Sequence, residues 1–132
     1  MLIGRELRDE IVAHARAEAP NECCGIVGAV DGRATTVYRA RNEFEDPRRY
    51  NVHPQDLFRI ISEIEEHGEE LAAIYHSHTK SEAYPSQTDV NLAVNWPDPL
   101  YAICSLAGPE PVLRAFWIRD AAVEEVELDV DD

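Results

Sequence analysis

The sequence is short of basic residues: 12 lysines and arginines stand against 26 aspartates and glutamates, which gives a formal net charge of -14. A surface with this charge repels the phosphate backbone of nucleic acids and the headgroups of anionic membranes. We therefore expect neither nucleic-acid nor membrane partners. Local basic spots remain, as at Arg48 and Arg49.

Long apolar runs are also missing. No stretch approaches the ~20 apolar residues of a membrane span, and residues 1–4 lead into charged helical sequence without the apolar core of a signal peptide. The three cysteines cannot form a fully paired disulfide framework, and their odd number suits a reducing compartment. These absences predict a cytoplasmic protein, and 132 residues without repeats or linkers fit a single domain, 1–132.

Apolar periodicity predicts a mixture of helices and strands. Amphipathic helices are expected at 5–19 and 54–67, and a short helix at 87–95. Strands are expected at 25–30, 34–40, 71–78, 100–106, 112–119 and 123–130, with a frayed, solvated end at 129–132. The fold class that follows is α/β or α+β, with one curled mixed β-sheet flanked by helices.

The pattern His76-x-His78, followed by Ser86 and Asp89, predicts a metal site. Two histidines separated by one residue lie on the same face of a strand, so both imidazoles can reach one cation. Asp89 can add a carboxylate oxygen from beyond the loop. Three protein ligands with one open position are typical of a hydrolytic zinc site.

Ser86 and Asp89 also have a purely structural interpretation. The segment from Ser86 to Asp89 matches a capping box, in which the two residues exchange hydrogen bonds at a helix N-terminus. The histidines favour metal binding, because His76 and His78 on an apolar strand face would be costly to bury without a partner. The two interpretations are compatible, since Ser86 can cap the helix and still point its hydroxyl towards the metal.

A zinc hydrolase also needs a group that moves protons. Glu22 is the best candidate, because it directly precedes the apolar strand that begins near Cys24. On spacing alone, an ordinary surface glutamate would be the preferred interpretation of Glu22.

Glu22 in its E-x-C-G context, together with His76-x-His78-x(7)-Ser86-x(2)-Asp89, resembles the JAMM metalloproteases, the catalytic MPN+ domains. The resemblance implies that Glu22 is general acid and base, that His76, His78 and Asp89 bind one Zn²⁺, and that Ser86 hydrogen-bonds the forming oxyanion. It also implies the MPN/JAMM fold, a curled mixed sheet with a cytidine-deaminase-like layout.

The segments around Tyr75 to Thr79 and Glu82 to Asp89 look like the small stand-alone bacterial branch of this family. That branch includes hydrolases that release cysteine from the C-terminal Gly-Gly of a ubiquitin-like sulfur-carrier protein during cysteine biosynthesis. The resemblance therefore implies such a carrier as partner, and cleavage of the peptide or isopeptide bond after Gly-Gly. Two alternatives stay open: an isopeptidase that removes ubiquitin-like modifiers from conjugated proteins, and a non-catalytic MPN scaffold. The oligomeric state is also open, with a homodimer compatible with the sequence.

Six other residues receive weaker interpretations. Strand alternation predicts that Cys23 and Cys24 point in opposite directions, with Cys24 packing in the core and the role of Cys23 open. His14 is expected at the surface. Arg48, Arg49 and Tyr50 are expected in a solvated loop. The alternative is that these three residues contact the carboxylate or the backbone of a substrate.

Overall fold

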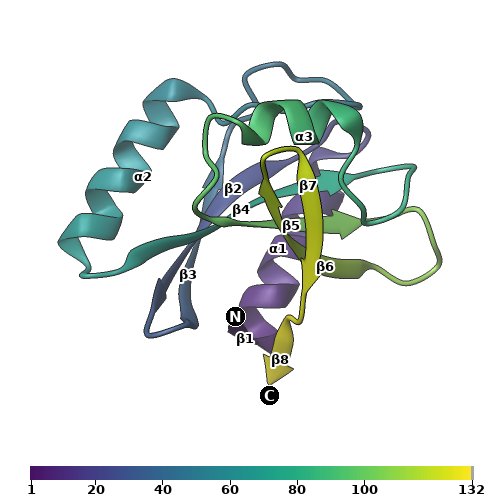
Figure 1. Ribbon diagram of the computed structural model, residues 1–132. Coiled ribbons are helices and arrows are strands. Elements are labelled where there is room, and N and C mark those ends of the chain that lie inside the picture. The colour runs from purple at the N-terminus through teal and green to yellow at the C-terminus, as the bar shows by residue number, and fades with distance from the viewer. Residues whose placement is uncertain (132) are drawn as a thin grey trace.

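The computed structural model describes residues 1–131, which form one eight-stranded sheet and three helices (Figure 1). The elements, in chain order, are β1 (Leu2–Gly4), α1 (Arg5–Glu18), β2 (Cys24–Val30), β3 (Arg33–Ala40), α2 (Pro54–Glu66), β4 (Glu70–His78), α3 (Gln87–Ala93), β5 (Leu100–Ser105), β6 (Val112–Arg119), β7 (Ala122–Val126) and β8 (Asp129–Asp131). None of the helices in this part of the chain is long and apolar enough to span a bilayer.

The sheet is mixed, with strand order β7-β6-β5-β4-β2-β3-β1-β8. Strand β4 is central: it pairs antiparallel with β2 and parallel with β5. The hairpin between β2 and β3 turns at Asp31 and Gly32, which both have positive φ (51° and 79°), as a tight hairpin turn requires. The expected curled mixed sheet with flanking helices is confirmed.

Helices cover both faces of the sheet. On one face, Ile11 and Ala15 of α1 pack in a cluster that also holds Val27 and Tyr75. On the other face, Ile60 of α2 and Ala93 of α3 pack in a second cluster with the strand residues Ile26, Ile74 and Ile103. Burial on both faces explains why the last six residues of β4 are all buried.

Cys23 and Cys24 lie in opposite clusters, as the alternation predicted: Cys23 packs on the α1 side and Cys24 on the α2 side. Both thiols are buried and free. Burial raises the pKa of the Cys23 thiol to about 12, so Cys23 has the properties of a packing residue and not of a nucleophile.

Glycine is required at position 25, within the E-x-C-G segment. Gly25 lies opposite Tyr75 in the β2–β4 register, and a Cβ at Gly25 would collide with the Tyr75 ring and with the Tyr38 carbonyl oxygen. The missing side chain lets the aromatic ring lie flat against the β2 backbone.

The C-terminal prediction was partly wrong. The expected single strand at 123–130 is divided into β7 and β8, and 129–131 is not a frayed end, because β8 pairs with β1 over three residues. Residue 132 lies outside the described part. Val126 and Val130 lie in β7 and β8, as the alternation predicted, whereas Leu128 lies in the break between these strands. The alternation carries no information about which partner strand each half finds.

The prediction for His14 was wrong. His14 is 3% exposed, and its Nδ1 lies 2.7 Å from the hydroxyl oxygen of Tyr75. It follows Ile11 by three positions and therefore lies on the buried stripe of α1. A polar residue on that stripe is tolerated because Tyr75 supplies its hydrogen-bond partner from β4.

Candidate active site

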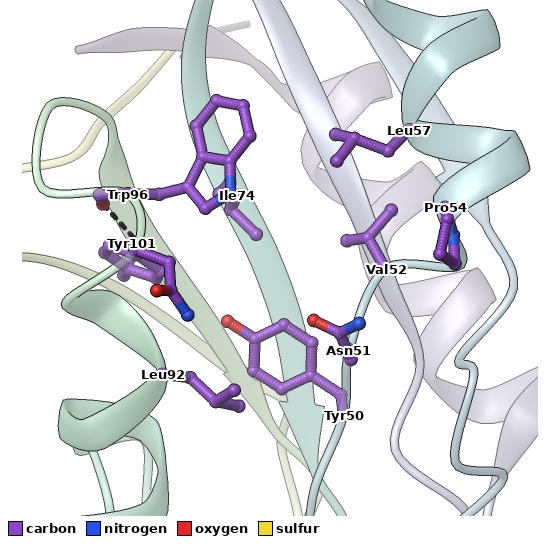
Figure 2. A pocket seen from close by; sticks show the side chains of 10 residues that line it. Tyr50, Asn51, Val52, Pro54, Leu57, Ile74, Leu92, Trp96 and Tyr101 are labelled. Carbon is purple, nitrogen blue, oxygen red and sulfur yellow. Dashed lines mark hydrogen bonds between the residues drawn. The ribbon is translucent and has the colours of Figure 1, made fainter.

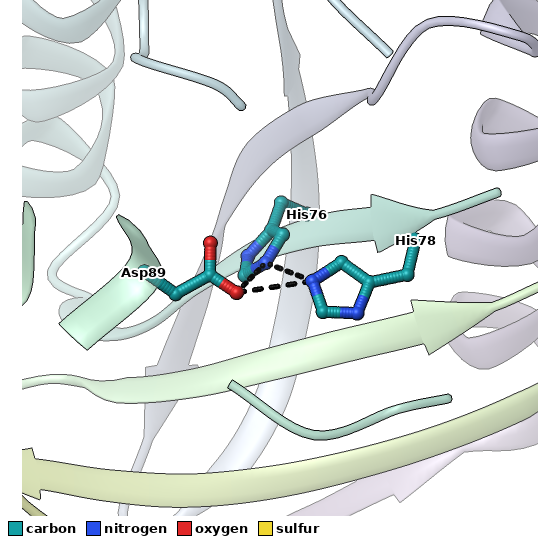
Figure 3. A group of neighbouring side chains, drawn as sticks. All are labelled: His76, His78 and Asp89. Atoms are coloured by element: carbon teal, nitrogen blue, oxygen red, sulfur yellow. Dashed lines mark hydrogen bonds and ion pairs between the residues drawn. The ribbon is translucent and has the colours of Figure 1, made fainter. Parts of the chain in front are cut away.

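Three potential metal ligands converge where β4 ends. His76 and His78 project from the last residues of β4, and Asp89 reaches them from α3 (Figure 3). The Nε2 atoms of His76 and His78 lie 3.2 Å apart. Asp89 Oδ2 lies 3.1 Å from His76 Nε2 and 3.0 Å from His78 Nε2. All three residues are at most 3% exposed. Within the described residues, this cluster could hold one metal ion.

Strand alternation produces this convergence. His76 and His78 share a face, while the intervening Ser77 points to the opposite side. There the Ser77 hydroxyl oxygen accepts a hydrogen bond from the Cys23 backbone N–H at 2.8 Å. Ser77 thus fastens the end of β4 to the residue that follows Glu22.

Each ligand is oriented by a second contact. His78 Nδ1 lies 2.8 Å from the Glu82 carbonyl oxygen, so donation from Nδ1–H leaves Nε2 with its lone pair towards the cluster. The His76 ring stacks on Tyr50 with ring centroids 4.2 Å apart. Asp89 Oδ2 accepts a hydrogen bond from the Ser86 backbone N–H at 2.9 Å.

Ser86 and Asp89 form the capping box of α3. The Ser86 hydroxyl oxygen accepts from the Asp89 backbone N–H at 3.1 Å, and the Asp89 carboxylate accepts from the Ser86 backbone N–H. The Ser86 hydroxyl keeps its own proton for another acceptor. The capping interpretation is therefore confirmed, and it leaves the Ser86 hydroxyl available for the site, whose chemistry stays a prediction.

The donor set fits zinc. Two imidazole nitrogens and one carboxylate oxygen are the ligand types that zinc takes. Glu22 Oε1 and Asp89 Oδ1 are buried and have no hydrogen-bond partner within the described residues. Buried carboxylate oxygens without partners are costly, and a cation in this cluster would compensate them.

The surroundings shift the pKa values of Asp89 and Glu22 in opposite directions. Burial alone would raise the pKa of Asp89, but His76, His78 and the Ser86 N–H together hold it well below its usual range. Burial, aided by the nearby Asp89, raises the pKa of Glu22 to about 8, while His78 opposes this shift. Asp89 is thus a permanent anion, and Glu22 can take up or release a proton near neutral pH.

Glu22, His78 and Ser86 line one cavity of about 520 Å³. Pro20, Arg48 and Lys80 contribute further to its wall. Glu22 itself is 3% exposed, and its backbone N–H donates to the Asp46 carbonyl oxygen at 3.0 Å. The structure therefore brings all five residues singled out in the sequence to one place.

A second cavity, of about 280 Å³, lies between α2, β4 and α3 (Figure 2). Its wall is mainly apolar and includes Leu57, Ile74, Leu92 and Trp96. Tyr50 points its hydroxyl into this cavity, while its ring stacks on His76. Tyr50 thus stands between the apolar cavity and the histidine cluster.

Sequence reasoning missed Tyr50. It was expected in a solvated loop, yet it is 4% exposed and packs in the core cluster on the α2 side. The loop it ends is polar, so periodicity gives no sign of its burial. The available signal in the sequence was an aromatic residue at the end of this polar loop, two positions before the apolar Val52.

Comparison with known proteins gives a consistent match. The model of the Prok-JAB family, described as prokaryotic homologs of the JAB domain, matches residues 4–119. The chain is 35% identical over 133 residues to the CysO-cysteine peptidase of Mycobacterium tuberculosis, covering 98% of this chain and 90% of that protein. It is 36% identical over 113 residues to the desampylase of Haloferax volcanii, covering 80% and 81%.

Solved structures agree with the fold. A protein from Desulfitobacterium hafniense has a TM-score of 0.90 at 31% identity, covering 100% of this chain and 94% of that one. A JAB1/MPN domain protein from Archaeoglobus fulgidus has a TM-score of 0.67 at 19% identity, with both chains covered completely, so that this second likeness concerns the fold alone.

Proposed function

This chain belongs to the prokaryotic homologs of the JAB domain and is a JAMM-type metalloprotease, and from this we propose that it is a zinc-dependent hydrolase of amide bonds after the C-terminal Gly-Gly of a ubiquitin-like sulfur-carrier protein. The observation that carries the proposal is one cluster in which His76, His78 and Asp89 converge beside a buried Glu22. The product would be free cysteine or a short C-terminal extension.

In this proposal His76, His78 and Asp89 hold the zinc. When bound, zinc lowers the pKa of a coordinated water to near 7 and polarises the scissile carbonyl. The contacts of His78 with Glu82 and of His76 with Tyr50 keep both imidazoles in place before the metal arrives.

Glu22 is the proton carrier of the reaction. Its carboxylate takes one proton from the attacking water, whose oxygen forms the new bond to the carbonyl carbon. When the C–N bond breaks, Glu22 delivers that proton to the departing nitrogen. The pKa of about 8 suits both transfers, because it lies close enough to neutral pH for Glu22 to be present in both the protonated and the ionised form.

Ser86 is the oxyanion donor. Its oxygen is occupied as an acceptor by the Asp89 N–H, so its O–H is free to donate into the cavity where it lies with Glu22. A donor of this kind contributes on the order of 3 kcal/mol to transition-state stability.

The substrate class rests on the relatives. A carrier–cysteine bond is supported by the likeness to a CysO-cysteine peptidase over nearly the whole chain. The likeness to a desampylase supports the second candidate, removal of a ubiquitin-like modifier from a conjugated protein. In both cases glycines before the scissile bond would let the substrate backbone lie close to the metal.

The test uses a small ubiquitin-like carrier ending in Gly-Gly-Cys and mass spectrometry before and after incubation with zinc-loaded protein. Loss of one cysteine is expected for the wild type. The Glu22→Gln variant should bind one zinc by elemental analysis yet leave the adduct intact, because Glu22 moves protons and does not ligate. A wild-type protein that binds no zinc would indicate the non-catalytic scaffold. Cutting of isopeptide-linked conjugates with survival of the cysteine adduct would favour modifier removal.

A further inference from the structure

We propose that Arg48 and Lys80 form a binding site for the free α-carboxylate of the departing amino acid. The protein would then act as a carboxypeptidase on carriers that bear one C-terminal residue, in preference to isopeptide-linked conjugates. This inference rests on the proposed hydrolysis after Gly-Gly and identifies the leaving group that the same site accepts.

The first observation is the charge of the cavity wall. Arg48 and Lys80, the only lysine in the sequence, line the cavity that holds Glu22, His78 and Ser86. Among the described residues that line that wall, Glu22 is the only carboxylate. This wall therefore holds two cationic side chains and one carboxylate, the reverse of the balance in a sequence with 26 acidic and 12 basic residues.

The second observation is that these two cations lack acidic partners. Seven arginines in residues 1–131 pair with carboxylates. Within the same residues, neither Arg48 nor Lys80 forms an ion pair. Unpaired cations beside a buried acid, in a protein rich in carboxylates, are suited to an anion that comes from outside.

The third observation is that both cations are tied to the backbone around Glu22. The loop before Arg48 is joined to Glu22 by the bond from the Glu22 N–H to the Asp46 carbonyl, and Asp46 Oδ1 accepts from the Arg48 N–H at 2.8 Å. Lys80 follows Thr79, whose hydroxyl donates to the Pro20 carbonyl oxygen at 3.3 Å. The two charges therefore reach the cavity from two different segments, each hydrogen-bonded to the backbone near Glu22.

The chemistry of the leaving group connects these observations. Because Glu22 delivers the proton to the departing nitrogen, the atoms attached to that nitrogen must lie in the cavity next to Glu22. In a free C-terminal amino acid, the carboxylate is separated from this nitrogen by a single carbon. In an isopeptide, the nitrogen carries the uncharged four-carbon stem of a lysine, so that no anion is placed beside Arg48 and Lys80.

The neighbouring Arg49 serves as a matched control. It lies in the same loop and is exposed, but it pairs with Asp46 at 3.5 Å and lies over the Phe44 ring at 4.2 Å. It is not part of the cavity wall. An effect of general surface charge would appear equally in Arg48→Gln and Arg49→Gln, whereas a specific site would not.

The experiment compares two probes that differ only at the C-terminus: a carrier ending in Gly-Gly-Cys with a free carboxylate, and the same carrier ending in cysteine amide. For the zinc-loaded wild type, kcat/KM should be about tenfold or more higher for the acid than for the amide, the range of a charge-assisted hydrogen bond. In Arg48→Gln/Lys80→Gln the ratio should fall to about one, while Arg49→Gln keeps the wild-type ratio.

A binding measurement gives a readout that is independent of turnover. The Glu22→Gln protein should bind the acid probe about tenfold more tightly than the amide by calorimetry, and the difference should vanish when Arg48→Gln and Lys80→Gln are added. Suppose that the wild type cleaves acid and amide equally and that the Glu22→Gln protein binds them equally. The carboxylate site would then be wrong, while the proposed hydrolase activity would stand. If zinc-loaded protein cleaves neither probe, the proposed function fails and this inference fails with it.

Discussion

The burial of His14 predicts that this residue contributes to the stability of the fold and that its contribution is lost on mild acidification. Burial lowers the pKa of His14 to about 4 from an ordinary value of 6.5. The positive charge of Arg39 adds to this shift, and the negative charge of Glu10 opposes it. The unfolded chain therefore binds a proton at this position between pH 6.5 and about 4, while the folded protein does not. The His14 contribution is complete above pH 6.5 and is lost progressively as the pH falls towards 4.

The magnitude follows from the shift. Lowering the pKa of His14 by about 2.5 units corresponds to about 3 kcal/mol of folding free energy over the pH range from 6.5 to about 4. Between about pH 7.5 and about pH 5, roughly 2 kcal/mol of this should be lost. Glu22 acts in the opposite direction, because its raised pKa makes the folded state bind more protons above pH 4.5, so the His14 effect must be measured as a difference between two proteins.

The assay is urea unfolding of wild type and His14→Gln at both pH values, with a chelator present so that metal binding does not contribute. The free-energy difference between the two proteins should change by about 2 kcal/mol, since the contribution of Glu22 is common to both and cancels. Tyr75→Phe is the informative comparison: burial is the main cause of the shift, so this variant should keep most of the pH dependence. An NMR titration of the folded wild type gives a second readout, and a His14 midpoint near pH 6.5 would refute the reasoning.

Three further changes test the surroundings of the site. Tyr50→Ala should destabilise the fold by about 3 kcal/mol and should lower zinc affinity, because the His76 ring loses its stacking partner. Tyr50→Phe should keep the stability and the zinc affinity of the wild type. Equal zinc affinity in the wild type and both variants would show that the ring contact does not matter for His76 as a ligand. Gly25→Ala should cost about 2 kcal/mol in denaturant unfolding, because the new Cβ overlaps the Tyr75 ring; an unchanged midpoint would contradict the packing described. Zinc at about 100 times its Kd should stabilise the wild type by about 2.7 kcal/mol in thermal unfolding and leave His78→Ala unaffected; comparable stabilisation of both would move the metal elsewhere.

Much of the site could be predicted because its geometry is local. The spacing of His76 and His78 needs only strand periodicity, and that of Ser86 and Asp89 needs only the first turn of a helix. Glu22 was different, since its proximity to the cluster depends on β2 pairing with β4. Its place before a strand made it a candidate, but only the resemblance to a known family favoured it over an ordinary surface glutamate.

The features that sequence reasoning missed all depend on distant contacts. The pairing of β8 with β1 joins the two ends of the described chain, and neither segment reveals its partner. The burial of His14 is stabilised by Tyr75, 61 residues away in the sequence. Tyr50 is buried because it packs against His76 on β4, although the loop it ends looks polar.

The alternation along β4 has a practical consequence for protein preparation. His76 and His78 face the cluster with Asp89, while Tyr75 faces α1. A one-residue slip of β4 against β2 would direct both histidines into the α1 side. Such a misfolded chain would retain its strands, so far-UV circular dichroism would hardly distinguish it from the native form. The zinc bound per chain in a refolded batch would then count the molecules whose central strand is correctly aligned.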